Sequence, residues 1–384
     1  MGESSFKAEV VNLLRQVKRR SKAAVSLGAE RVVLRGILQH AIGYPAASSA
    51  SAGPGGRQKP HFLIARYKYH AHDPSLGPST EEQALDNTLE ASGFGTSDTY
   101  FWETEYSGFP RGDWALLDKC RRVRPDAIVL SSYEPGYAAH PRLDTIRMIR
   151  KTWGIPIVAI WYDTCWDGFW ASIEPALPYI DVHVISDNPL MTFLEGRDPS
   201  IRRRFVDQNH PWDFSVYNDP GRPRDIEVSF LGQVGGYRSA RMPYIAYLME
   251  HNVPVYWSGF NRAEQPPLSK YVEVLTRSKI GLNFSHSVNH HQMKGRIFEV
   301  MLCGAMLMES ENPQTPCYLR PMKDYVSFES PPDLVEKLRY FLDHDDERTA
   351  IAARGHERAL QHCDNYAFWK KIADRIEEAR EWPL

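Results

Sequence analysis

Short runs of apolar residues alternate with longer segments of helical periodicity from about residue 61 to the end of the chain. Two of these runs, 126–132 (DAIVLSS) and 155–162 (IPIVAIWY), are almost continuously apolar. Strands that are covered by helices on both faces have this pattern. Strands that are separated by helical segments are typical of βαβ units. The sequence therefore predicts an α/β fold with parallel sheets.

The order of the segments divides the chain. A stretch rich in Pro, Asp and Asn, residues 207–224 (DQNHPWDFSVYNDPGRPR), is predicted to connect two domains. We predict an N-terminal helical extension over 1–44, a flexible Gly/Ser/Ala/Pro linker over 45–60, Rossmann-like domains over 61–215 and 216–364, and a final helix over 365–384.

The composition bounds the class of protein. A formal net charge of −2 argues against a general nucleic-acid binder. No apolar run reaches the roughly 18 residues of a transmembrane helix, and the N-terminus lacks the apolar core of a signal peptide. The 5 cysteines form no CxxC pair, so we expect reduced thiols and a cytoplasmic protein. The basic pattern of residues 5–42 predicts either peripheral contact with the inner face of a membrane or a packing helix with a solvated basic face.

The most informative stretch is 279–311. It reads as an apolar run (280–284), a polar loop (285–294), a short helix that ends near Gly304, and a second apolar run (305–308). The helix N-terminus would meet the carboxyl end of a parallel sheet, where ligands bind in open α/β folds. Its N–H groups and dipole favour a phosphate there.

Arg296 and Glu299 share one face of this helix because they stand three residues apart. Arg296 or Lys294 could give a phosphate charge-assisted hydrogen bonds, and the Glu299 carboxylate could accept hydrogen bonds from two vicinal hydroxyls, as on a ribose. An exposed Arg296–Glu299 ion pair, contributing ~0.2–0.5 kcal/mol, explains the same spacing.

The segment RIFEVMLCGAMLMES (296–310) resembles a signature in the C-terminal domain of GT-B glycosyltransferases, most of all the family 4-like and CgeB (YkvP)-like group. Glu299 matches the second of two glutamates that family 4 places seven residues apart, and His291 stands at the position of the first. The resemblance implies two Rossmann-like domains facing across a cleft, with a nucleotide-sugar donor on the second and a glycan, lipid or protein acceptor on the first. It also implies that the final helix crosses back to the first domain.

The resemblance further implies transfer without a bound metal or other cofactor, in a setting such as polysaccharide biosynthesis. The three histidines of the polar loop do not suggest zinc, because no thiol partner or HExxH pattern accompanies them. We expect either His290 or His291 to donate a hydrogen bond to phosphate, unless both are solvated loop residues.

A second donor motif opens the second domain, FLGQVGGYRSAR (230–241). A strand ends there in a glycine-containing turn, and small residues such as Gly232 let backbone amides approach a phosphate. Arg238 or Arg241 could neutralise the phosphate, unless both are solvated arginines after a tight turn.

Three candidates follow predicted strands of the first domain, so they should face the same cleft. Asp163 comes just after the run 155–162 and could deprotonate an acceptor hydroxyl, bind the sugar or cap a helix. Tyr137, in the loop 134–140, and Asp187, after the strand 181–186, are candidates for the acceptor side.

Two other classes of protein remain open. A nucleotide-sugar 2-epimerase of the GT-B type would turn over its substrate without an acceptor. A catalytically silent GT-B-like binding or scaffold protein would show no donor turnover, and the broken glutamate pair at His291 is compatible with it.

Overall fold

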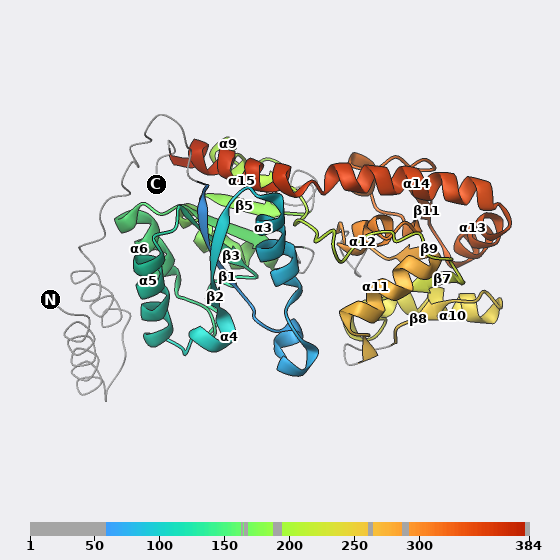
Figure 1. The fold of residues 1–384 in the computed structure, drawn as a ribbon, viewed down its shortest axis with the longest axis horizontal. Coiled ribbons are helices and arrows are strands. Elements are labelled where there is room, and N and C mark those ends of the chain that lie inside the picture. Colours follow the sequence, from blue (N-terminus) through green and yellow to red (C-terminus); the bar gives the residue numbers. More distant parts are fainter. Residues whose placement is uncertain are drawn as a thin grey trace.

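The computed structural model describes residues 59–162, 164, 168–186, 194–259, 264–285 and 292–380. The predicted extension over 1–44 lies outside the described residues, as does nearly all of the linker predicted over 45–60. The described chain forms two α/β units, which Figure 1 shows side by side. The α/β class with parallel sheets is confirmed.

The first unit contains a six-stranded parallel sheet with the strand order β2-β1-β3-β4-β5-β6. Its strands are β1 (His61–Arg66), β2 (Thr96–Phe101), β3 (Ala127–Ser131), β4 (Ile157–Trp161), β5 (Val182–Ile185) and β6 (Phe205–Asp207). Its helices and helical turns are η1 (His70–His72), η2 (Pro74–Leu76), the π-helical η3 (Glu82–Asn87), α3 (Thr88–Ser92), α4 (Trp102–Glu105), α5 (Arg111–Val123), α6 (Leu143–Trp153), α7 (Phe169–Ile173), η4 (Glu174–Tyr179) and α9 (Pro199–Arg202).

Alternate residues of these strands pack on opposite faces of the first sheet. Leu63 and Ala65 of β1 belong to a core with α5, α6 and α7. Phe62 and Ile64 belong to a second core with η3, α3 and a helix from the far end of the chain. Because both faces are covered, the strands are apolar at nearly every position, which is the pattern that the sequence shows.

The second unit contains a five-stranded parallel sheet with the order β11-β10-β9-β7-β8. Its strands are β7 (Ile226–Phe230), β8 (Tyr256–Trp257), β9 (Ser278–Asn283), β10 (Met306–Ser310) and β11 (Val326–Phe328). Its helices and helical turns are η5 (Gly236–Arg241), α10 (Met242–Glu250), α11 (Leu268–Arg277), α12 (Arg296–Leu302), η7 (Thr315–Cys317), α13 (Pro331–Asp343) and α14 (Asp345–His362).

The second sheet is also covered on both faces. Met306 and Met308 of β10 pack with α10 and α13. Leu307 of β10, with Ala305 just before the strand, packs on the other face with α11 and α12. The short α12 stops at the sequence Cys303–Gly304, where Gly304 has φ 75°. A residue without a Cβ adopts this conformation readily, so the chain reverses directly into β10.

The last helix, α15 (Asn365–Arg380), belongs by its packing to the first unit. Figure 1 shows it lying along the first sheet after the chain leaves α14. Phe368, Trp369 and Ile372 are buried against this sheet, and Trp369 Nε1 donates to Thr88 Oγ1 at 3.2 Å. The two units are therefore joined by two separate stretches of chain.

The other connection runs from β6 to β7. Asp213 caps a turn within it by accepting hydrogen bonds from the backbone and hydroxyl of Ser215 at 2.9 and 2.6 Å. Its second carboxylate oxygen accepts a hydrogen bond from Asn87 Nδ2 of η3 at 3.0 Å. This connection is therefore fixed to the first unit by a side-chain contact.

Two strands, β6 and β11, were not predicted, because each is a three-residue edge strand without a long apolar run. Among the described residues no helix is long and apolar enough to cross a membrane.

Candidate functional site

A small cavity of about 110 Å³ lies between the two units. It is bordered by the start of η3, the end of β4, the connection between the units and the helix α12. The residues that line it are Thr80, Glu81, Gln83, Ala84, Tyr162, His210, Pro211, Trp212, Asp213, Tyr217 and Glu299. Glu299, the residue predicted to bind a ribose, therefore lies at the boundary with the first unit.

Glu299 stands one turn into α12 and is held by the neighbouring helix α11. Its carboxylate accepts a short hydrogen bond from the Tyr271 hydroxyl. Burial raises the pKa of Glu299, while the nearby Arg296 and the Tyr271 hydrogen bond act in the opposite direction. Because both neighbours favour the charged form, Glu299 is a positioned hydrogen-bond acceptor at the wall of the cavity.

Arg296 does not pair with Glu299 on an exposed helix face. Its Nη1 donates to Asn283 Oδ1 at 3.2 Å, and its guanidinium lies 5.3 Å from the ring centroid of Phe230. The side chain thus bridges the ends of β7 and β9, and its predicted contact with a phosphate remains a prediction.

Gly232 makes room for this arrangement. A Cβ at Gly232 would lie 2.8 Å from Arg296 Nη2 and 2.9 Å from Phe230 Cζ. Any larger residue would push the guanidinium away from the turn. Glycine therefore lets the Arg296 guanidinium lie close to the backbone of this turn, and the phosphate-binding role predicted for Gly232 remains a prediction.

The two arginines of η5 differ in environment. Arg241 is 2% exposed, and it donates to Gln233 O at 3.0 Å and to Phe284 O at 3.2 Å. It fixes the loop after β7 to the end of β9. Arg238 is only partly buried on the same helical turn. It is therefore better placed than Arg241 to contact a ligand, because Arg241 would have to give up its hydrogen bonds to the two backbone carbonyls.

Lys294 and Gln292 connect the second unit to the first. They belong to the segment 292–295 just before α12, which we call the donor-side loop because the sequence predicts a sugar-nucleotide donor there. Lys294 Nζ donates a short hydrogen bond to Gln292 Oε1, and Gln292 Nε2 donates to Tyr162 O at 2.6 Å. Gln292 is 1% exposed. The carbonyl that it binds belongs to the residue just before Asp163, so this part of the first unit is held against the donor-side loop.

Three predicted site residues, Asp163, Asp187 and His291, lie outside the described residues. Tyr137 is described and is 51% exposed, and it is not among the residues that line the cavity. The roles assigned to all of these residues from the sequence remain predictions.

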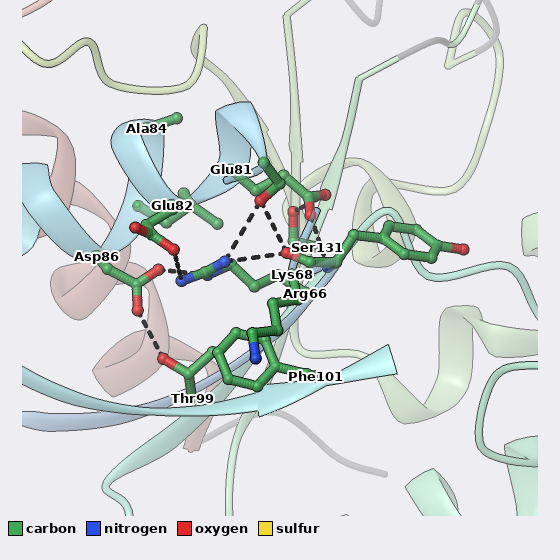
Figure 2. A network of polar contacts seen from close by, with 12 residues as sticks. Arg66, Lys68, Glu81, Glu82, Ala84, Asp86, Thr99, Phe101 and Ser131 are labelled. Carbon is green, nitrogen blue, oxygen red and sulfur yellow. Dashed lines mark hydrogen bonds and ion pairs between the residues drawn. The ribbon is translucent and has the colours of Figure 1, made fainter. Parts of the chain in front are cut away.

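Sequence reasoning missed Glu81, a carboxylate of the first unit that lines the cavity. Glu81 Oε1 accepts hydrogen bonds from the hydroxyls of Ser131 and Ser132 at 2.7 and 2.6 Å, and Oε2 accepts one from Tyr67 N at 2.8 Å. Ser132 has φ 53°, an uncommon value for a residue with a Cβ, and this conformation follows directly on β3. Figure 2 shows how Glu81 and Ser131 meet.

The cation nearest to Glu81 is engaged by other carboxylates. Arg66 Nε lies 2.6 Å from Asp86 Oδ2 and its Nη2 lies 3.0 Å from Glu82 Oε2, as Figure 2 shows. Burial raises the pKa of Glu81, and Arg66 is the smallest of the opposing effects. Glu81 is therefore a carboxyl group whose affinity for a proton is increased at the edge of a cavity, as suits a proton acceptor in catalysis.

A second missed carboxylate, Glu309, lies at the carboxyl end of β10 and is 0% exposed. It accepts hydrogen bonds from Ser285 Oγ and from Asn283 Nδ2, the latter at 3.1 Å. Burial raises the pKa of Glu309 to about 7. This network joins the ends of β9 and β10 beside the donor-side loop.

No group of three His, Cys, Asp or Glu side chains suited to a metal ion occurs within the part of the chain that the structure describes. The prediction that transfer needs no bound metal remains a prediction.

Part of the chain is similar to a known protein family. Residues 230–374, which include the donor-side loops and α12, match the Glycosyl transferase-like family model. No curated protein sequence matches the chain.

Solved structures match over most of the chain. HepE from Anabaena in complex with UDP-glucose has a TM-score of 0.57 at 10% identity, covering 83% of this chain and 100% of HepE. The sucrose-phosphate synthase of Thermosynechococcus elongatus has a TM-score of 0.55 at 10% identity, and the match covers 84% of this chain and 100% of the synthase. An α1,3-fucosyltransferase has a TM-score of 0.51 at 12% identity, and the match covers 86% of this chain and 93% of the fucosyltransferase. The chain therefore has the GT-B fold of two Rossmann-like domains.

Proposed function

We propose that the protein is a glycosyltransferase that moves a sugar, a hexose, from a nucleotide-diphosphate sugar to an acceptor hydroxyl. The observation that carries the proposal is the convergence of Gly232, Arg296 and Glu299 at the carboxyl edge of the second sheet, inside the segment that matches the Glycosyl transferase-like family. The complex of HepE with UDP-glucose supports a nucleotide-sugar donor for this fold. We also retain the family 4-like or CgeB-like subgroup as a proposal.

The donor would bind to the second domain. Glu299 would accept hydrogen bonds from the ribose hydroxyls, beside the Tyr271 hydroxyl that already orients it. Arg238 and Lys294 would contact the diphosphate, with His291 from the loop between β9 and α12. Arg241 would contribute by fixing the loop after β7, since its donors already bind two backbone carbonyls.

The reaction places growing negative charge on the leaving diphosphate. Positioned guanidinium and ammonium groups with backbone N–H groups stabilise such charge when they are fixed before the reaction. We propose that Arg238, Arg296 and Lys294 fill this role and that no bound metal or other cofactor is required.

An inverting reaction would require a base for the acceptor hydroxyl. Asp163 is one candidate, because Tyr162, directly before it, lines the cavity and is held by Gln292. Glu81 is a second candidate in the same cavity. In a retaining reaction the leaving phosphate would accept this proton, and neither carboxylate would be needed as a base.

The acceptor is a glycan, a lipid or a protein in this proposal, and the site is cytoplasmic. Peripheral contact with a membrane through the basic residues of 1–44 is retained as a further proposal.

Calorimetric titration of the purified protein with UDP, GDP, dTDP and CMP, with and without Mg²⁺, tests the donor assignment. Tight binding of one nucleotide in both conditions is the expected result, and binding only with Mg²⁺ would refute metal independence. Binding of none of the four would count against the proposed function. Turnover of the matching sugar nucleotide without any acceptor, to an epimer, would instead identify an epimerase.

A further inference from the structure

A group of aromatic rings surrounds His140 at the carboxyl edge of the first sheet. We name it the aromatic wall, and its members are Tyr67, His72, Trp102, Tyr133, Tyr137 and His140. Ring centroids of Trp102, Tyr137, Tyr67 and Tyr133 lie 4.8, 5.1, 5.7 and 5.8 Å from that of His140. Tyr67 is also joined to the cavity, because its N–H donates to Glu81. The wall is therefore linked, through the backbone of Tyr67, to a carboxylate that lines the cavity.

Hydrogen bonds fix the tautomer of His140. The Glu134 N–H donates to His140 Nδ1 at 3.0 Å, so this nitrogen carries no proton. Burial lowers the pKa of His140 to about 4, so the ring is neutral near pH 7. Its single proton is therefore on Nε2, which donates to the Tyr67 hydroxyl oxygen over 2.9 Å.

This tautomer leaves the Tyr67 proton available. Because the Tyr67 oxygen accepts from His140, the hydroxyl must donate elsewhere, and none of the described residues provides an acceptor for it. Burial raises the pKa of Tyr67, and the neighbouring acidic groups raise it further, so the hydroxyl stays protonated. Tyr67 is thus an oriented donor for an oxygen atom that the described part of the chain does not supply.

Two rings of the wall are open to solvent. Tyr137 is 51% exposed, and the side chain of His72, which lies 4.0 Å from the Tyr67 ring, is 53% exposed. The electron-rich face of an aromatic ring attracts the polarised C–H groups of a sugar ring. An exposed tyrosine beside a fixed hydroxyl donor therefore offers both of the contacts that a pyranose makes.

The surrounding charge discriminates between sugars. Glu134, Glu81 and Glu103 all lie near enough to Tyr67 to raise its pKa. Two cations lie nearby: Arg66, which is engaged by Glu82 and Asp86, and Lys68, whose ammonium group lies over the rings of Tyr69 and Phe101. A phosphate placed against this wall would meet a surplus of carboxylates, whereas an uncharged sugar would not.

We propose that the aromatic wall is the acceptor subsite and that it takes a neutral saccharide, stacked on Tyr137 and hydrogen-bonded by Tyr67. This inference rests on the proposed function, and it names the class of acceptor.

Saturation-transfer NMR on the full chain tests the proposal without requiring turnover. The neutral probes are the methyl glycosides of glucose, galactose and N-acetylglucosamine, and the anionic probes are glucose 6-phosphate and glycerol phosphate. We expect transfer from aromatic protons to at least one neutral probe and weaker transfer to both anions. Tyr137→Ala should weaken the binding about fivefold or more, and Tyr67→Phe, which keeps the ring, about fivefold.

Tyr340→Ala is the matched control, since Tyr340 is 42% exposed on α13 of the other unit. Equal losses in this control and in Tyr137→Ala would overturn the proposal, and so would stronger binding of the anions or no transfer to any neutral probe. Nucleotide binding measured on the same samples separates the two proposals. A protein that binds a nucleotide but no neutral sugar refutes only the acceptor subsite, and one that binds no nucleotide refutes the proposed function.

Discussion

Replacing Glu299 tests the ribose contact most directly. Glu299→Ala removes the carboxylate that would accept hydrogen bonds from both ribose hydroxyls. Hydrogen bonds to a charged group contribute about 1.5–3 kcal/mol each, so a net loss of about 3 kcal/mol is expected, which weakens nucleotide binding by about a hundredfold. Glu299→Gln retains one acceptor oxygen and should weaken binding by about tenfold.

The same substitution also has a structural effect that must be separated from binding. Glu299→Ala leaves the Tyr271 hydroxyl without the partner that it has in the native protein. An unsatisfied polar group of this kind costs about 1–3 kcal/mol of stability, so the variant should melt earlier but remain folded. Tyr271→Phe breaks the same hydrogen bond and keeps the carboxylate, so it should bind the nucleotide nearly as well as the native protein does.

Calorimetry with the ribonucleotide and its 2′,3′-dideoxy analogue provides the decisive comparison. If Glu299 binds the ribose, the dideoxy analogue should bind the native protein weakly, and Glu299→Ala should weaken it little further, because the two changes remove one shared interaction. Equal loss of affinity for both nucleotides in Glu299→Ala would refute the ribose contact. Weak binding by Tyr271→Phe would assign the loss to the packing of α11 on α12 instead.

Three further predictions concern other parts of the molecule. Because burial raises the pKa of Glu309 from 4.5 to about 7, folding favours its proton; the stability that this group contributes is complete below about pH 4.5 and falls by about 3 kcal/mol as the pH rises through 7. Denaturant titrations at pH 5 and pH 8 should show a smaller fall in Glu309→Gln, and an unchanged fall would contradict the burial argument. Trp369→Ala should cost about 3–5 kcal/mol in the same titrations, because the ring is 0% exposed; a cost near zero would show that α15 does not stabilise the first unit. Gln292→Ala should slow turnover, because it frees the Tyr162 carbonyl, and should alter nucleotide affinity only through Lys294, which loses its Gln292 partner; unchanged turnover would refute this coupling.

The parts of the fold that could be predicted are those encoded by local patterns. Strands β3 and β4 are buried on both faces, so their apolar runs identify them without knowledge of their neighbours. Edge strands such as β6 and β11 carry three residues each and are defined by their pairing partners, which a local pattern does not contain.

The candidate site divides in a similar way. Glu299 was found because it stands at a fixed spacing from Arg296 on one helix. Glu81 was not found, because its hydrogen-bond partners Ser131 and Ser132 lie 50 and 51 residues away and come together only when η3 packs beside β3. One signal was available in the sequence: the acidic pair Glu81–Glu82 follows the first predicted strand, at the carboxyl edge of the sheet where ligands bind in such folds.

The position of α15 has a consequence for how the chain is made. The ribosome synthesises the strands of the first sheet long before it reaches Trp369, which fills the core on one face of that sheet. This face, which η3 and α3 cover in part, is therefore not fully buried until the whole second unit has been synthesised. A nascent or truncated chain that ends before α15 lacks Trp369 beside Phe62, so the first unit, although its strands are made before the second unit, completes its core after it.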